Sequence, residues 1–120
     1  MDENKKERLA EAGIDVENAL ERFMENEGLL ERFLKKFLND QNFSKLTVAI
    51  GEKKEQEALA ASHTLKGVCG NLSMGRLYGL ATEQVNLFRA GRWQEAADLM
   101  PQMSAEYETI CETLRRELAD

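Results

Sequence analysis

The stretch "NEGLLERFLKKFLND", residues 26–40, places apolar side chains three or four positions apart along its length. These side chains are Leu29, Leu30, Phe33, Leu34, Phe37 and Leu38. Because an α-helix turns once in about 3.6 residues, this spacing gathers them on one face and leaves the charged residues on the other. The stretch therefore predicts an amphipathic helix that needs a partner surface for its apolar side.

Apolar stripes on both sides of this stretch predict several more helices. Before it, "AGIDVENALERFMEN", residues 12–26, opens a helix with Asp15 as the N-cap. Further helices are expected over residues 46–50, 53–72, 75–91 and 93–118. Gly51 is expected to stop or bend its helix, and Gly91 to follow the end of its own as the C′ residue. Pro101 lacks a backbone donor, so we expect a kink or a short break there.

These helices and the turns between them define the fold class. Long helices joined by short turns bury their apolar stripes against each other, most simply as an antiparallel four-helix bundle. No strand-like alternation of apolar and polar residues competes with this arrangement. We therefore predict an all-α protein whose short additional N-terminal helices cap one end of the bundle. Residues 1–120 are expected to form a single domain, in which residues 1–13 fray or pack loosely.

The composition excludes several classes of function. A net charge of −6 argues against general affinity for nucleic acid, because phosphate backbones select basic surfaces. The opening residues lack the apolar run of a signal peptide, and no stretch approaches a membrane-spanning length. Cys69 and Cys111 are too few for a disulfide framework and fall on apolar stripes. We expect buried thiols in a reduced, cytoplasmic setting.

The chain contains one histidine, in "SHTLKGVCGNLSMG", residues 62–75, and two glycines follow it closely. A glycine inside a helix costs about 1 kcal/mol relative to alanine, so two glycines in one helix call for a structural or functional explanation. At about 100° per residue, His63 lies about 160° from Leu65, the centre of the core stripe, and should face solvent. The residues expected to share its face are Gln56, Leu59, Lys66, Gly67, Gly70 and Met74.

A single histidine on a helix is most often an ordinary surface residue, and helical glycines often serve packing between helices. Here Gly67 and Gly70 lie on the side of His63, where bare backbone leaves room for another molecule to approach. Lys66, one turn away, places a cation where an anion attached to the ring would sit. The combination predicts a histidine that carries a phosphoryl group and presents it to a partner.

The motif "HTLKG", residues 63–67, resembles the signature of histidine-containing phosphotransfer (HPt) domains, the four-helix relay modules of multistep two-component signalling. The likeness extends over residues 13–40 and residues 60–84. It implies that His63 is the phosphoacceptor, that Lys66 stabilises the phosphoryl group and that Gly67 gives access to the ring. The family usually has small residues where this chain has Val68 and Cys69, and tends to have glycine at the position of Ser73.

The resemblance also implies a mechanism and its partners. A receiver domain would transfer a phosphoryl group from its aspartyl phosphate to His63, from which it passes to another receiver aspartate. The partners would be response-regulator receiver domains, a hybrid sensor histidine kinase, or both. The chain itself is expected to be a monomeric carrier without kinase activity, cofactor or metal, and Mg²⁺ would reside on the receiver.

Two further sets of residues follow from the same interpretation. The partner is expected to contact Gln56, Leu59, Gly70 and Met74. A polar residue of the next helix often orients the imidazole in this family, and the candidates are Glu83, Gln84 and Asn86. Among these we favour Gln84, because it interrupts an otherwise apolar series of positions.

Two alternatives remain open at the level of sequence. The chain could be a helical-bundle interaction module that binds a signalling partner without accepting phosphate. It could also use His63 with a nearby carboxylate as a weak metal site. This alternative has little support, because the chain has one histidine and no fitting spacing of other ligands. A phosphate on His63 that is labile in acid and stable in alkali would separate the first interpretation from both.

Overall fold

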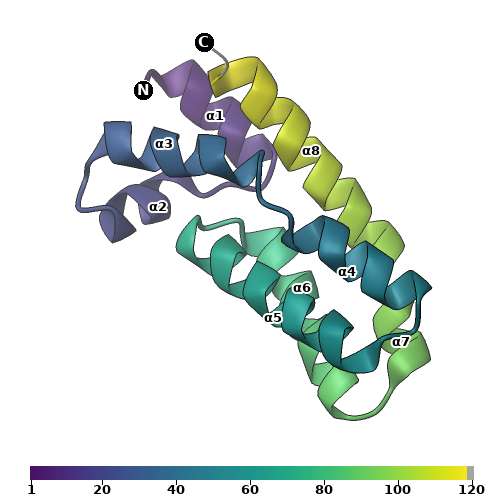
Figure 1. Cartoon of the computed structure of the whole chain (residues 1–120). Coiled ribbons are helices and arrows are strands. Elements are labelled where there is room, and N and C mark those ends of the chain that lie inside the picture. Colours follow the sequence, from purple (N-terminus) through teal and green to yellow (C-terminus); the bar gives the residue numbers. More distant parts are fainter. Residues whose placement is uncertain (119–120) are drawn as a thin grey trace.

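The chain folds into helices joined by short turns. A computed structural model describes residues 1–118 and forms eight helices within them (Figure 1). Their bounds are α1 Glu3–Glu11, α2 Val16–Arg22, α3 Glu27–Phe37, α4 Asn42–Gly51, α5 Glu55–Asn71, α6 Gly75–Arg89, α7 Trp93–Ala97 and α8 Met100–Leu118. The predicted all-α class is confirmed.

Helices α4, α5, α6 and α8 form the bundle, and each runs antiparallel to the next along the chain (Figure 1). The central helix α5 packs most extensively on α4 and α6. The bundle closes between α4 and α8, where the rings of Phe43 and Tyr107 stack with centroids 4.4 Å apart. The short helices α1, α2 and α3 lie together at one end, as predicted, and α7 lies at the other (Figure 1).

The ends of several helices follow the predicted signals. The Asp15 carboxylate accepts a hydrogen bond of 3.1 Å from the backbone N–H of Asn18 and so caps α2. Gly91 follows the C-cap of α6 with a φ of +74°, the left-handed conformation that glycine adopts without steric cost. The predicted interruption near Pro101 is a break between α7 and α8, and Pro101 is the second residue of α8, where a missing donor costs little.

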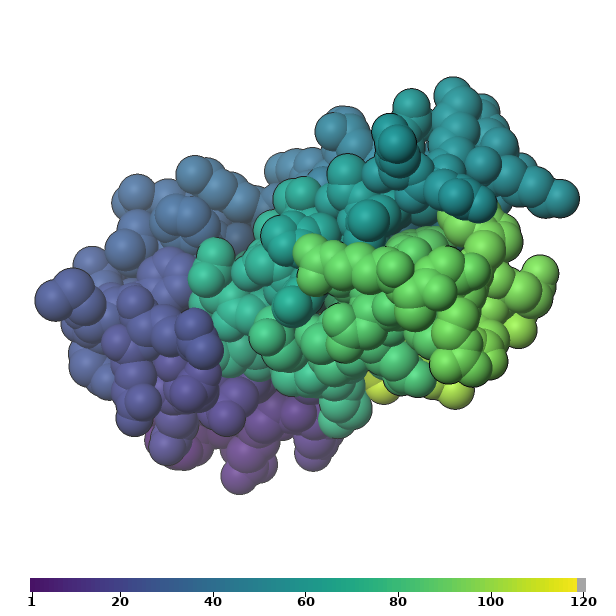
Figure 2. Space-filling model, turned by 90° about the horizontal axis from the view of Figure 1, so that it is seen from below, coloured from purple at the N-terminus to yellow at the C-terminus, as the bar shows by residue number. Residues whose placement is uncertain are grey.

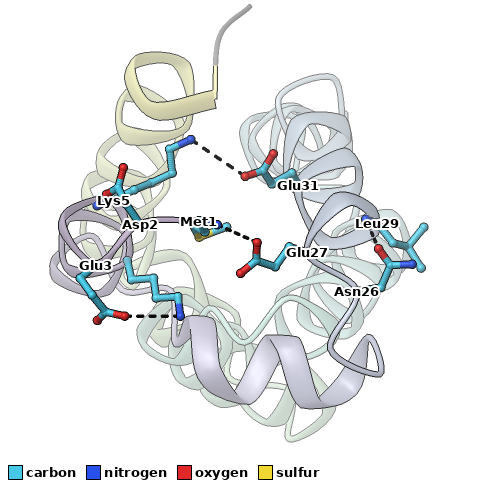
Figure 3. Close-up of polar contacts among 9 residues, drawn as sticks. Met1, Asp2, Glu3, Lys5, Asn26, Glu27, Leu29 and Glu31 are labelled. Atoms are coloured by element: carbon cyan, nitrogen blue, oxygen red, sulfur yellow. Dashed lines mark hydrogen bonds and ion pairs between the residues drawn. The ribbon is translucent and has the colours of Figure 1, made fainter.

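The N-terminal segment forms α1 and packs against the rest of the fold, so the prediction that residues 1–13 pack loosely is wrong. Leu9 is completely buried in the core. Arg8 donates to Glu117 of α8 at 2.7 Å, and the ammonium group of Met1 donates to Glu27 of α3 at 2.6 Å (Figure 3). The hydrogen bond from this ammonium lowers the pKa of Glu27. These contacts hold α1 against two helices that lie far from it in sequence.

A buried hydrogen bond between two polar side chains connects α5 to α6, and contacts of the same amide group extend to α7 and α8. Ser62 of α5 donates its hydroxyl to Oε1 of Gln84 in α6 at 2.7 Å, and both residues are completely buried. The Nε2 group of Gln84 donates to the carbonyl of Ala96 in α7 at 3.0 Å and faces the sulfur of Met100 in α8 at 3.3 Å. Ser62 and Leu65 both point inward, and His63 lies about 160° from Leu65 around α5, so His63 points away from the core.

We predict that Gln84→Ala destabilises the protein by about 2–4 kcal/mol, because it leaves a cavity and removes the partner of the buried Ser62 hydroxyl. Urea unfolding followed by circular dichroism measures the change. Glu83→Ala, at the exposed neighbouring position, is the matched control and should change the free energy of unfolding by less than about 0.5 kcal/mol. Equal stability of the two variants would contradict the structural role of Gln84.

Candidate functional site

His63 stands on the solvent face of α5, as the helical spacing predicts. Its neighbours Ser62 and Leu65 are completely buried, whereas His63 itself is exposed. Within residues 1–118, no hydrogen bond or ion pair holds its ring. An exposed imidazole whose nitrogens are not engaged within the fold is a suitable nucleophile near neutral pH.

The imidazole borders an open hollow of about 510 Å³ between α5, the start of α6 and the N-terminal helix α2. Figure 2 shows the N-terminal segments, coloured purple to blue, lying against the teal and green segments of α5 and α6. The residues that line this hollow include His63, Lys66 and Gly67 of α5, Asn18 and Arg22 of α2, and Tyr78 of α6. The structure therefore brings the three residues predicted for phosphate chemistry to one concave surface.

The two glycines beside His63 have different surroundings. A Cβ atom at Gly67 would meet nothing within 4 Å, so the backbone there is open to an approaching molecule, as predicted. A Cβ atom at Gly70 would lie 3.0 Å and 3.2 Å from two ring carbons of Tyr78. Gly70 therefore lets the Tyr78 ring of α6 pack closely on α5, so the prediction that helix packing does not explain this glycine is wrong. Gly70 also lines the hollow of His63, and its contact with a partner stays a prediction.

Three other residues were predicted to contact the partner, and only Met74 lines the hollow of His63. Met74 is completely buried, because the turn after α5 directs it into the core, so its side chain offers no docking surface and that prediction is wrong. Gln56 and Leu59 do share the His63 face of α5. They border a separate hollow of about 190 Å³, which they line together with Phe88 and Trp93.

The prediction that Gln84 orients the imidazole is also wrong. Its amide oxygen accepts from Ser62, and its amide nitrogen donates to Ala96 and to Met100. All of these partners lie in the interior, on the opposite side of α5 from His63. Glu83 and Asn86, the other two candidates, are exposed on α6, and no hydrogen bond joins either to His63 in the described part of the chain.

The turn between α5 and α6 explains the preference for glycine at position 73. Ser73 has a φ of +54°, a conformation that costs a residue with a side chain about 1 kcal/mol or more. Its hydroxyl donates to Oδ1 of Asn18 at 2.6 Å, and its carbonyl accepts from the backbone N–H of Asp15 at 2.9 Å. Two hydrogen bonds to the start of α2 thus hold this conformation and fasten α2 beside the site.

Asn18 and Arg22 are the site residues that sequence reasoning missed. Arg22 donates its Nε–H to Oδ1 of Asn18 at 3.1 Å, and both residues line the hollow beside His63. The only local signal was their spacing of one helical turn, which is common on exposed helices. Their nearness to His63 depends on how α2 folds back onto the turn at Ser73, which no short-range pattern encodes.

The chemistry of the cysteines and of the acidic residues offers no competing site in the described part of the chain. Burial raises the pKa of the Cys69 thiol to about 12 and also raises the pKa of Cys111, so both remain protonated at neutral pH. Residues 1–118 contain no group of three or more His, Cys, Asp or Glu side chains arranged to hold a metal ion. None of the described helices combines the length and the apolar character that crossing a membrane requires.

Comparison with known proteins gives one match. A protein-family model described as "Hpt domain" matches residues 20–117. The searches of curated proteins and of solved structures find no significant match. The matched region covers the bundle, the exposed histidine of α5 and every lining residue of the hollow except Asp15 and Asn18, so the chain belongs to the family of Hpt domains, the histidine phosphotransfer modules of phosphorelays.

Proposed function

We propose that this protein carries a phosphoryl group on His63, which it accepts from an aspartyl phosphate on a receiver domain and passes to another receiver aspartate. The observation that supports the proposal most strongly is the position of His63. It is exposed and unpaired on α5, and it borders a hollow with Lys66 and the open backbone of Gly67. The partners proposed are response-regulator receiver domains, a hybrid sensor histidine kinase, or both, in the cytoplasm.

The transfer of the phosphoryl group needs no reactant beyond the two proteins. A ring nitrogen of His63 attacks the phosphorus, the bond from phosphorus to the aspartyl oxygen breaks, and the receiver regains its carboxylate. Little covalent chemistry is left for side chains, so positioning and charge stabilisation dominate. Lys66 lies one turn from His63, is half buried and lines the same hollow. Because it is this close to the ring, its ammonium group offsets the charge of the phosphoryl oxygens.

In this proposal the chain is a carrier and a substrate of its partners, without turnover of its own. It supplies the nucleophile and a cation, and the receiver supplies the acidic pocket and its Mg²⁺. The open backbone at Gly67 matters because the receiver must bring that pocket within bonding distance of the ring. Each of these three roles makes a separate prediction.

We predict that His63→Gln abolishes phosphate acceptance and leaves the helical fold intact, because His63 lies outside the core. Labelled phosphate transferred from a phosphorylated receiver measures acceptance, and stability of the label in alkali with loss in acid identifies phosphohistidine. Circular dichroism checks the fold. Label retained on the variant would contradict the assignment. A wild-type protein that binds receivers without acquiring label would instead be an interaction module.

Lys66→Ala should slow transfer or shorten the lifetime of the phosphohistidine, by an amount that corresponds to about 1–3 kcal/mol for a charge-assisted hydrogen bond. Rapid-quench kinetics and the decay of labelled protein measure the two quantities. Lys45→Ala on α4, which removes an exposed lysine away from the hollow, is the control for net charge. If both variants behave alike, Lys66 is only a solvated surface charge.

Gly67→Gln should block transfer by filling the approach to the imidazole, while the free protein becomes as stable as the wild type or more so by up to about 1 kcal/mol. The stability gain is expected because a side chain at Gly67 meets open space. Thermal melting and phosphotransfer are measured on the same sample. Gly79→Gln, at an equally open glycine of α6, should be similarly stable and should transfer normally. A Gly67→Gln protein that still transfers at the wild-type rate would show that access at this position is unimportant.

A further inference from the structure

Arg22 lies on the wall of the hollow beside His63 and is not paired with a carboxylate. Four other arginines form ion pairs with glutamates: Arg8, Arg76, Arg92 and Arg116. Arg22 is held instead by a neutral acceptor, Oδ1 of Asn18, through its Nε–H. Within residues 1–118 its two terminal nitrogens have no partner. The hydrogen bond through Nε therefore orients the guanidinium, and both Nη groups stay available to a bound partner.

The anchor of Arg22 is itself fixed. Oδ1 of Asn18 also accepts the hydroxyl of Ser73 at 2.6 Å, and the backbone N–H of Asn18 donates to the Asp15 cap. Asp15 carries the one carboxylate among the residues that line the hollow of His63, and this carboxylate is engaged in capping α2. The guanidinium is therefore pre-organised by the same turn that shapes the site, which reduces the entropy lost on binding a partner.

Arg22 also stands between two concave surfaces. It lines the hollow of His63 and a second hollow of about 400 Å³, whose walls include Phe23, Phe33 and Val68. Asn71 borders both hollows as well. A group bound at Arg22 would thus lie beside apolar side chains and also near Lys36 and Asp40, the other charged residues of the second hollow.

The residues that share the hollow with Arg22 indicate which part of a bound partner it contacts. Asn71, which borders both hollows with it, lies more than two turns beyond His63, about 12 Å along the helix axis. A phosphoryl group on His63 lies beside Lys66 instead, one turn away. Lys66 is therefore the cation that α5 places beside the transferred group, and a protein that covers the hollow to reach His63 also meets Arg22 on its wall.

Building on the proposed function, we propose that Arg22 binds a carboxylate on the receiver domain that exchanges phosphate with His63. The paired Nη groups of an arginine match the two oxygens of a carboxylate, and such contacts fix orientation as well as adding affinity. A carboxylate on the receiver complements the charge of Arg22, and the contact would set the orientation of the receiver over the hollow. Arg22 is thus a positioning residue for the partner and not a ligand of the phosphoryl group.

The test compares Arg22→Gln with Arg32→Gln, which makes the same change of charge at an exposed position of α3 outside both hollows. The donor is the receiver domain that phosphorylates the wild-type protein fastest within a panel loaded from acetyl phosphate. We expect Arg22→Gln to lower kcat/KM for transfer about tenfold, mainly through KM, and Arg32→Gln to change it less than twofold. The difference should shrink as ionic strength rises.

A second readout separates the partner from the phosphoryl group. The isolated protein is phosphorylated on His63 with phosphoramidate, and the decay of the phosphohistidine is followed without any receiver. The proposal expects the same lifetime for wild type and Arg22→Gln, and an intermediate kcat/KM for Arg22→Lys, which keeps the charge but loses the planar fork. A shortened lifetime in Arg22→Gln would overturn the proposal, because Arg22 would then stabilise the phosphoryl group itself.

Two other outcomes also decide the matter. Equal transfer by Arg22→Gln and Arg32→Gln overturns the role of Arg22 while the function proposed for His63 stands. A wild-type protein that accepts no phosphate from any receiver overturns both. Circular dichroism melting accompanies each variant, and if Arg22→Gln is destabilised the comparison rests on Arg22→Lys, for which a wild-type kcat/KM would contradict the carboxylate contact.

Discussion

The hydrogen bond between Ser62 and Gln84 is the interaction on which the geometry of the site depends. Both groups are completely buried, and the Gln84 amide is in turn bonded to Ala96 and faces Met100. Because an unpaired buried hydroxyl or amide costs free energy, α5 is held at the rotation that points Ser62 inward. That rotation directs His63 to solvent. A polar contact in the interior thus determines which residue the bundle presents to a partner.

The second constraint is the turn after α5, where a left-handed residue with a side chain is held by hydrogen bonds to the N-terminal region. Ser73 takes a φ of +54° and bonds to Asn18 and Asp15. The conformational cost is offset by joining two segments that are distant in sequence. As a result, α2 becomes a wall of the hollow beside His63, and the bundle gains a concave surface that its four long helices alone would not form.

Charge and backbone access are distributed unevenly over this surface. The chain is acidic as a whole, with a net charge of −6, yet Lys66 and Arg22 both border the hollow of His63. Of the two glycines that follow the histidine, Gly67 leaves the backbone open and Gly70 admits the ring of Tyr78. Two glycines about one turn apart on α5 thus differ in what the missing side chain allows: open backbone at Gly67, and close packing of the Tyr78 ring at Gly70.

The sequence by itself determined the helices, the all-α class, the exposure of His63 and the nearness of Lys66 and Gly67, because these follow from helical periodicity, capping residues and spacing within one helix. It did not determine what depends on contacts between helices. The burial of Met74, the inward role of Gln84, the packing of Tyr78 on Gly70 and the packing of α1 were each decided by neighbours distant in sequence. The approach of Asn18 and Arg22 to His63 belongs to the same class. Local patterns fix which face of a helix is apolar, and only the tertiary structure decides which polar and small residues meet across the faces.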